Sequence, residues 1–193
     1  MRTIVLLVLG IVVALQLLVP ASMISKHERI LRTGELYRFK TEPIDPADPF
    51  QGRYVRLGFE NDYIPGTNEK EQAPEYNERV FVTLATNADG FCRLTGWSRT
   101  KPETGAFLKL TYFGPKHDWN RQARTYKGLW FRLPFDRFYM EEKKAPRAET
   151  LVREGTRNTN CWATVRILNG AALIENVYVG GTPIRELAVQ SKK

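Results

Sequence analysis

The chain has 193 residues, 42% of them hydrophobic, which is enough for one sizeable core or two small fused ones. Its 29 basic and 21 acidic side chains give a net charge of +8. Such a surface suits anionic headgroups or polyanionic polymers, although the acids are interleaved along the chain and an ordinary solvated surface is the alternative. No nucleic-acid-binding module is recognisable, so we expect no nucleic-acid partner.

The first part of the chain is an apolar run from residue 4 to residue 24. A helix over those 21 positions would measure about 31 Å, enough to cross the hydrocarbon core of a bilayer. The alternative is a cleaved signal peptide, because Val19, Pro20 and Ala21 place small residues near a cleavage point. The length of the run, the single basic residue Arg2 before it and Pro20 beside the cut favour an uncleaved signal anchor. We therefore expect a transmembrane segment over 1–25 and a separate domain over 26–193.

The charges around this segment bear on its orientation. Lys26, Arg29 and Arg32 follow the run, whereas only Arg2 and the terminal amine precede it. The positive-inside rule alone would keep the domain in the cytoplasm, but long domains are exported largely regardless of charge. A short tail that stays inside is usual for signal anchors. We expect the inner (cytoplasmic) membrane as the location, with the domain facing the periplasm or cell exterior.

After the anchor, short runs of alternating apolar residues predict a mainly β domain. Asp89-Gly90 and Asn169-Gly170 are tight-turn signals, each between two such runs, and therefore predict two hairpins. Short helices are expected over 69–78 and 145–154, the second with Pro146 near its start. Strands are expected over 36–41, 52–59, 79–86, 91–97, 107–113, 128–135, 161–168 and 171–179.

One of these runs occurs twice. Residues 52–59 read GRYVRLGF and residues 128–135 read GLWFRLPF, an offset of 128 − 52 = 76. An acid follows each copy (Glu60 and Asp136), and Tyr63 and Tyr139 keep the same offset. Each half then continues with a short helix and a hairpin. The sequence therefore predicts an internal duplication over about 36–113 and 114–184, closed into a pseudo-two-fold β barrel or sandwich.

The first copy also carries a resemblance to a known family. Gly52, Tyr54 and Leu57 match the named positions of the GDYXXLXY family of membrane-anchored bacterial proteins. The chain departs from the motif at Arg53, where the family has Asp, and at Phe59, where it has Tyr. The same resemblance extends to a proline-aspartate lead-in, to residues 135–139 and to residues 180–184; the lead-in comprises Pro43, Asp45, Pro46, Asp48 and Pro49. It implies no established activity, and Arg53 argues against carboxylate chemistry in this strand.

Candidate chemistry is sparse. Glu60 and Asp136 hold equivalent positions and would suit acid-base work if they faced each other. The alternative is that they are solvated or pair with Arg56 and Arg132. The two histidines, at positions 27 and 117, have no nucleophile or ligand spacing around them, so we expect no metal and no cofactor.

The two cysteines, Cys92 and Cys161, lie one in each half. In an oxidising compartment they would form one disulfide between the halves; otherwise they are two buried thiols. No His or further Cys lies near either one, which argues against a metal pair.

Two functions from different classes remain. The first is a non-catalytic interaction module that presents a basic and aromatic surface, including the expected loop over 116–124, to a membrane protein or envelope component. The second is an envelope hydrolase that uses Glu60 and Asp136. The absence of catalytic spacing favours the first, so we do not expect an enzyme.

Overall fold

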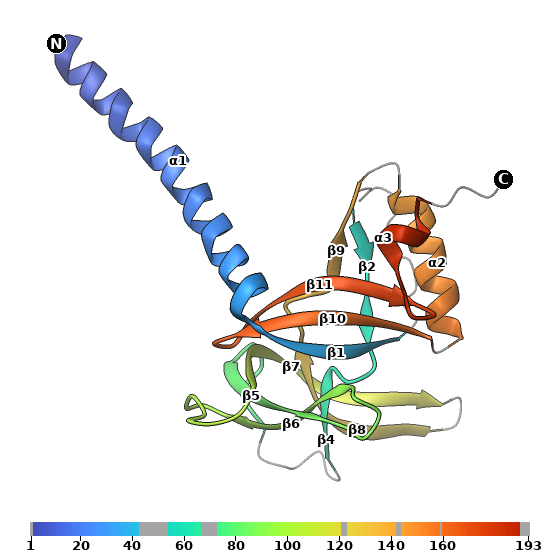
Figure 1. Ribbon diagram of the computed structural model, residues 1–193. Helices are drawn as coiled ribbons and strands as arrows, with labels where there is room; N and C mark the ends of the chain where they lie inside the picture. The colour runs from blue at the N-terminus through green and yellow to red at the C-terminus, as the bar shows by residue number, and fades with distance from the viewer. Residues whose placement is uncertain are drawn as a thin grey trace.

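A computed structural model describes residues 2–42, 54–66, 73–120, 123–141, 144–158 and 160–189. A long amino-terminal helix projects from a β domain that carries two further helices on one side (Figure 1), so the expected mainly β class with one apolar leading helix is confirmed. The elements are, in chain order, α1 Arg2–Thr33, β1 Glu35–Glu42, β2 Tyr54–Arg56, β3 Gly58–Phe59, β4 Tyr63–Pro65, β5 Arg79–Thr86, β6 Cys92–Ser98, β7 Phe107–Asn120, β8 Ala123–Arg132, β9 Arg137–Tyr139, α2 Ala145–Arg157, β10 Cys161–Leu168, β11 Ala171–Val179, β12 Thr182–Pro183 and α3 Ile184–Leu187.

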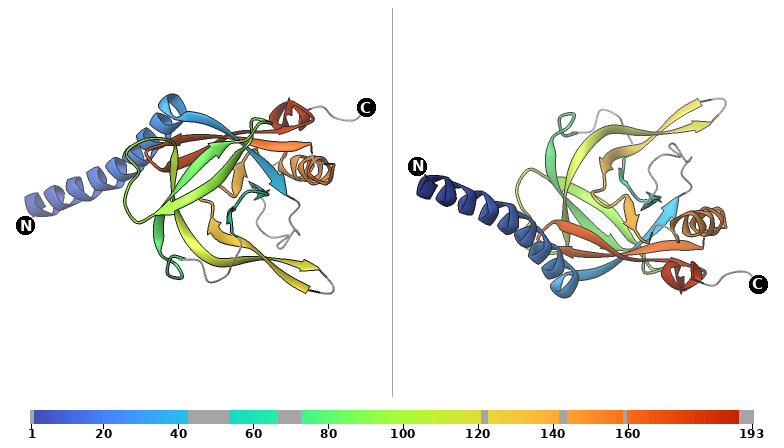
Figure 2. Two further views of the ribbon diagram at one scale, coloured as in Figure 1. Left: turned by 90° about the horizontal axis from the view of Figure 1, so that it is seen from below. Right: turned by 90° about the horizontal axis from the view of Figure 1, so that it is seen from above.

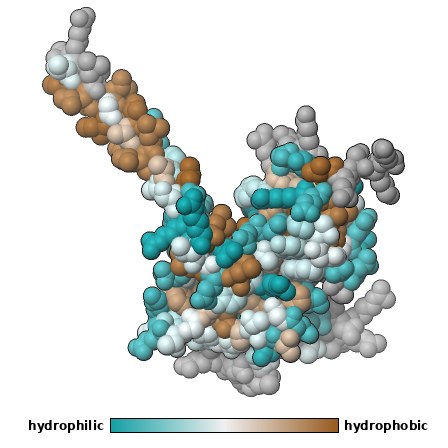
Figure 3. Space-filling view, in the orientation of Figure 1, coloured by the Kyte–Doolittle hydropathy of each residue, from teal (hydrophilic) through white to brown (hydrophobic). Residues whose placement is uncertain are grey.

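Helix α1 is longer than the apolar run that predicts it. It continues through Pro20 and past residue 25 without a break and ends at Thr33. The stretch Leu7–Thr33 is long and apolar enough to span a membrane, and none of its most apolar window is buried against the domain. The described large apolar side chains of its first 24 residues are exposed, and they form the brown surface of the projecting helix in Figure 3. Such a surface is the one that a lipid bilayer covers.

Three sheets make up the domain. One five-stranded sheet has the order β12-β11-β10-β1-β3, the other has the order β4-β8-β7-β5-β6, and β2 pairs with β9 in a two-stranded sheet. The five-stranded sheets are open in the described part of the chain, so a closed barrel is not formed there. Both views of Figure 2 show the β7–β8 ribbon, in yellow, projecting away from the side that carries α1.

A single apolar core joins the sheets. Phe39 of β1 is fully buried and contacts the rings of Phe59 and Phe135, with ring centroids 6.0 and 5.1 Å away. The alternating side chains of the strands supply the other members, as expected for strands with one face toward a core. These include Val80, Val82, Leu94, Leu108, Leu110, Phe131, Ala163, Val165 and Val177.

Each copy of the repeated run pairs with a short strand that follows the other copy. In β2 and β9 Tyr54 pairs with Tyr139, and in β4 and β8 Tyr63 pairs with Trp130. Adding the offset of 76 turns Tyr54 into Trp130 (54 + 76 = 130) and Tyr63 into Tyr139 (63 + 76 = 139). The offset of 76 therefore relates the β2–β9 strand pair to the β4–β8 strand pair.

Three local expectations are wrong. The strand expected over 52–59 is divided at Leu57 into β2 and β3, and its first two residues lie outside the described chain. The helix expected over 69–78 is absent from its described part, 73–78, which forms turns. Strand β7 does not end before Gly114-Pro115 but continues to Asn120, because a bulge between Tyr112 and Gly114 accommodates the pair. The expected basic and aromatic loop over 116–124 is therefore mostly the tip of the β7–β8 ribbon.

The strand expected over 128–135 is only partly formed, because β8 begins at Ala123 and ends at Arg132. Other expected elements follow the sequence closely. Helix α2 covers the expected 145–154 and extends to Arg157, with Pro146 in its first turn. The turn before β11 uses Asn169 and Gly170 at φ values of 51° and 81°, as a tight hairpin requires.

Candidate functional site

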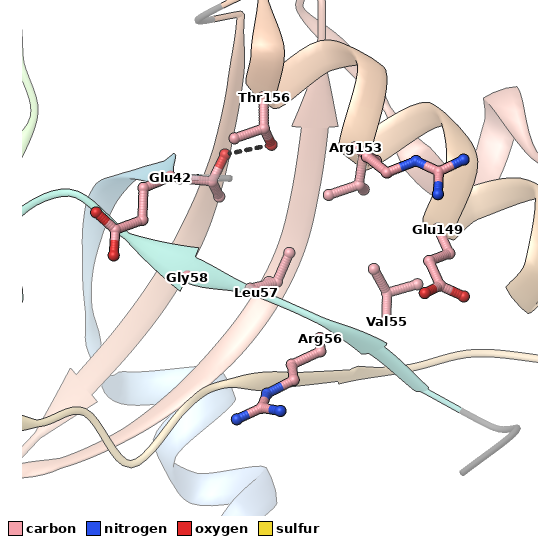
Figure 4. Close-up of a pocket in the computed structure, with 10 residues that line it drawn as sticks. Glu42, Val55, Arg56, Leu57, Gly58, Glu149, Arg153 and Thr156 are labelled. Atoms are coloured by element: carbon pink, nitrogen blue, oxygen red, sulfur yellow. Dashed lines mark hydrogen bonds between the residues drawn. The ribbon is translucent and has the colours of Figure 1, made fainter. Parts of the chain in front are cut away.

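The crevice beside the motif strand is the first candidate site. It lies between the end of β1, the β2–β3 strand and α2, and Val55 and Leu57 form its apolar floor (Figure 4). Its volume of about 50 Å³ has room for one or two water molecules. Substrate pockets are commonly about 300–1,000 Å³. The crevice therefore suits a single side chain better than a substrate.

Charged side chains surround this crevice without forming a catalytic group. Glu149 and Arg153 extend from α2, and Arg56 and Glu42 extend from the strands (Figure 4). Deeper in, the hydroxyl oxygens of Thr41 and Thr156 lie 3.0 Å apart, and Thr41 donates to the Cys161 carbonyl at 2.9 Å. These bonds satisfy buried polar groups where α2 meets β1 and β10.

The described motif residues support the fold. Leu57 and Phe59 are buried in the core. Tyr54 packs edge-on against Tyr139 at 5.8 Å, and the guanidinium of Arg137 lies 4.9 Å from its ring centre. Gly52 and Arg53 lie outside the described residues.

A partly buried charged cluster is the second candidate site. Lys116 of β7 donates to both carboxylate oxygens of Asp62 at 2.9 and 3.3 Å. The indole nitrogen of Trp130 donates to the same carboxylate at 2.6 Å. Glu42 lies 3.7 Å from the Lys116 ammonium. The cluster ties β1, β4, β7 and β8 together, and these strands belong to both large sheets.

Burial perturbs the acids of this cluster. Desolvation raises the pKa of Asp62 above its usual value, against the opposing effects of Lys116 and Trp130. Desolvation is also the main cause that raises the pKa of Glu42, again opposed by Lys116. Perturbed carboxyls occur in active sites and in structural ion pairs alike. Both carboxylate oxygens of Asp62 already accept hydrogen bonds from Lys116 or Trp130, which favours a structural role.

These raised values predict a pH dependence. The folded chain holds protons on Asp62 and Glu42 at a pH where the unfolded chain has released them. Their contribution to stability is therefore present at acidic pH and is lost as the pH rises through the folded-state pKa values. Asp62→Asn removes one of the two groups. The unfolding free energy of the wild type relative to this variant should therefore increase as the pH falls from 7 to about 4, the ordinary pKa of an aspartate.

Urea unfolding of the full chain in detergent across this pH range measures the difference. Asp118→Asn is the matched control, because the Asp118 carboxylate is exposed and pairs with Lys127 at the surface. Parallel pH profiles for wild type and Asp62→Asn would contradict the prediction.

Comparison with known proteins adds one finding. The family described as GDYXXLXY protein matches residues 16–177, most of the chain. The chain belongs to the GDYXXLXY family. Comparison with curated proteins gives no match, and comparison with solved structures gives none either.

The two acids that the sequence singled out have different neighbours in this GDYXXLXY protein. Glu60 lies 3.2 Å from Lys40, and Asp136 lies 3.7 Å from Arg137. Their expected partners are engaged elsewhere: the Arg132 guanidinium lies 4.5 Å from the Phe113 ring centre, and Arg56 borders the crevice. No ion pair or hydrogen bond in the described part of the chain joins the Glu60 side chain to the Asp136 side chain.

The cysteines of this GDYXXLXY protein are buried thiols. Cys92 and Cys161 are free in the structure, and burial raises the pKa of Cys92 to about 12 and also raises that of Cys161. Thiols of this kind are poor nucleophiles. A disulfide between them stays a prediction. Among the described residues, no group of three His, Cys, Asp or Glu side chains is placed to hold a metal ion.

Sequence reasoning missed the Asp62 cluster. Its members come from three strands and from the residue before β4, and no spacing along the chain connects Asp62 with Lys116 or Trp130. The one available signal is the repeat. Asp62 directly precedes Tyr63, which follows the first copy of the repeated run, and Trp130 lies in the second copy.

Proposed function

We propose that this protein is held in the inner membrane by α1 and presents its β domain on the outer side as a non-catalytic interaction module of the bacterial envelope. The observation that carries the proposal is the form of α1. Its apolar part projects free of the domain, whereas its last turns pack on β10 and β11. Ile30 near its end is 4% exposed. The helix is thus an anchor and, at its end, a part of the domain.

The size of the β domain supports this orientation, because long domains are exported largely regardless of the charges that flank the helix. The packing of Ile30 also supports an uncleaved helix. Cleavage near Ala21 would leave only the last turns of α1 attached to the domain, without the apolar part that precedes them.

Retention of the helix is directly measurable. We expect the intact mass of the protein from washed membranes to correspond to the full chain, apart from processing of the first Met. A mass that lacks residues 1–21 would show a cleaved signal peptide and would contradict the anchor.

An interaction role is favoured over hydrolysis by the surroundings of the candidate acids. Glu60 and Asp136 each lie near a cation at a partly exposed position, and such pairs usually contribute about 0–1 kcal/mol. Neither acid lines the small crevice beside the motif. Asp136 lines an open hollow of about 340 Å³ beside β11, and Glu60 does not line it, so the two acids do not share a pocket.

Neutralising the two acids tests the hydrolase alternative. We expect Glu60→Gln and Asp136→Asn to change the melting temperature by less than about 4 °C and to restore the wild-type phenotype in a strain that lacks the gene. Leu57→Ala is the control for a change that acts through folding. Loss of function in a normally folded Glu60→Gln or Asp136→Asn protein would favour the envelope hydrolase over the interaction module.

An internal duplication is the architecture that the strand pairing supports. Besides the two related strand pairs, both hairpins carry a bulge at a corresponding place. The register shifts between Thr83 and Leu84 in β5 and between Thr164 and Val165 in β10. The first strand of each hairpin also pairs with a strand outside the hairpin, β5 with β7 and β10 with β1. We infer two interlocked copies related by a pseudo-two-fold axis near Phe59 and Phe135.

A further inference from the structure

A groove of about 510 Å³ lies where α1 meets the β domain. One wall is the end of α1, and the other is the turn between β10 and β11 together with Pro134. Figure 1 shows this turn beside the end of α1. We call it the junction groove. Its basic lining residues are Lys26 and Arg29 of α1 and Lys109 of β7, with His27 beside them. Figure 3 shows a hydrophilic surface at this end of the helix, directly after the apolar part.

The groove has a fixed geometry because α1 is attached to the domain. Lys26, Arg29, Ile30 and Thr33 follow the spacing of one helix face, and Ile30 on that face is buried. Directly after the helix, the Gly34 carbonyl accepts a hydrogen bond from Arg166 at 3.1 Å. The basic side chains of α1 are thereby held next to Lys109.

The charge in the groove is uncompensated. No acidic side chain lines it, and none of Lys26, Arg29 and Lys109 forms an ion pair with a described acid. Neighbouring Arg32, by contrast, pairs with Glu28 at 2.6 Å. The Lys109 ammonium lies 5.3 Å from the ring centre of Phe81, which leaves its charge unneutralised. A concave site with three cations outside ion pairs is suited to a multiply coordinated anion such as a phosphate group.

The depth of the groove matches the lipid headgroups. The apolar run ends at Ile24, so Lys26 and Arg29 lie two and five residues further, or about 3 and 8 Å along the helix axis. The headgroup region on each side of a bilayer is about 5–8 Å thick. Leu168, Leu173 and Pro134 line the same groove and offer apolar contact to the glycerol and upper acyl carbons.

We propose that the junction groove binds the headgroup of an anionic phospholipid in the leaflet beside the domain. The inference rests on the proposed membrane anchoring by α1. It also gives a role to Lys26 and Arg29, whose position after the helix opposes the positive-inside rule. Lipid is favoured over an acidic peptide because the charges lie at headgroup depth and share the groove with an apolar wall.

The test uses the full chain in detergent, titrated separately with phosphatidylglycerol, with zwitterionic phosphatidylcholine and with a peptide rich in Asp and Glu. Binding is observed by native mass spectrometry. We expect one phosphatidylglycerol to bind the wild type with a clear preference over phosphatidylcholine. Each basic residue near a headgroup contributes about fivefold in affinity. The variant Lys26→Gln/Arg29→Gln/Lys109→Gln should therefore lose the preference, and Lys109→Gln alone should weaken binding by about fivefold.

The matched control is Arg93→Gln/Lys101→Gln/Arg157→Gln, which removes three exposed positive charges outside the groove. This control should bind phosphatidylglycerol as the wild type does. The melting temperatures of both triple variants should lie within a few degrees of the wild-type value. Three outcomes overturn the proposal: no preference in the wild type, an equal loss in the control, or binding of an acidic peptide in place of phosphatidylglycerol.

Carbonate-washed membranes from the same cells separate this proposal from the anchoring on which it rests. If the wild type is extracted by carbonate, the proposed anchoring fails. If it stays in the membranes but shows no preference for phosphatidylglycerol, only the groove proposal fails.

Discussion

Gly128→Ala is expected to destabilise the β domain by more than about 4 kcal/mol, a loss large enough to prevent folding of many domains. Gly128 opens the second copy of the repeated run and pairs with Pro65 of β4 and Lys116 of β7. A Cβ atom at this position would lie 1.9 Å from the Ile64 carbonyl oxygen and 2.8 Å from its carbon. Because those atoms belong to the backbone, the methyl group fits only if β4 separates from β8.

Gly105→Ala is the matched control. Gly105 has a φ of 84°, and a Cβ atom there would have no neighbour within 4 Å. Its replacement therefore costs backbone strain alone, about 1–3 kcal/mol. Urea unfolding of the purified chains, followed by circular dichroism in detergent, gives both values. Equal losses of unfolding free energy in the two variants would show that the close approach of Gly128 to β4 does not add to the cost of the substitution.

Phe59→Ala and Phe135→Ala should each cost about 3–5 kcal/mol of unfolding free energy. Both rings are 4% exposed, and their centroids lie 5.3 Å apart in an edge-on contact. The two residues are equivalent in the repeat, since 59 + 76 = 135, and both contact Phe39. The proposed duplication therefore predicts nearly equal costs. Leu36→Ala, on the exposed side of β1, is the control and should cost little.

The double variant Phe59→Ala/Phe135→Ala tests whether the two rings act together. Aromatic pairs in contact typically couple by about 0.5–1.5 kcal/mol. We expect the double loss to differ from the sum of the single losses by an amount in this range. Additive losses, or single losses that differ by several kcal/mol, would argue against a shared centre between the two copies.

Local patterns predicted the elements of this fold better than their arrangement. The apolar run gave α1, and Asn169-Gly170 gave the β10–β11 hairpin, because helix length and turn geometry depend on neighbouring residues. Gly114-Pro115 misled the prediction of β7, since a bulge lets a strand continue through residues that ordinarily end it. The pairing of β1 with β10 joins residues more than 120 positions apart, and no local signal specifies it.

The same distinction applies to the candidate sites. The repeated run identified Leu57 and Phe59, whose burial follows from their strand. The Asp62–Lys116 pair and the junction groove arise only when distant elements meet. Lys26 and Arg29 were visible as charges after the apolar run, but Lys109 joins them only because α1 packs on β10 and β11 and β11 lies beside β7.

The central claim is that α1 holds the β domain outside the inner membrane, and labelling of a single introduced cysteine tests it most directly. Asp89→Cys lies in the exposed turn between β5 and β6. Cys92 and Cys161 are buried, so their reaction with a membrane-impermeant maleimide should be slow. We predict that Asp89→Cys is labelled in intact spheroplasts as fully as after lysis, with the labelled protein in the membrane fraction. Labelling that appears only after lysis would place the domain in the cytoplasm and contradict the account.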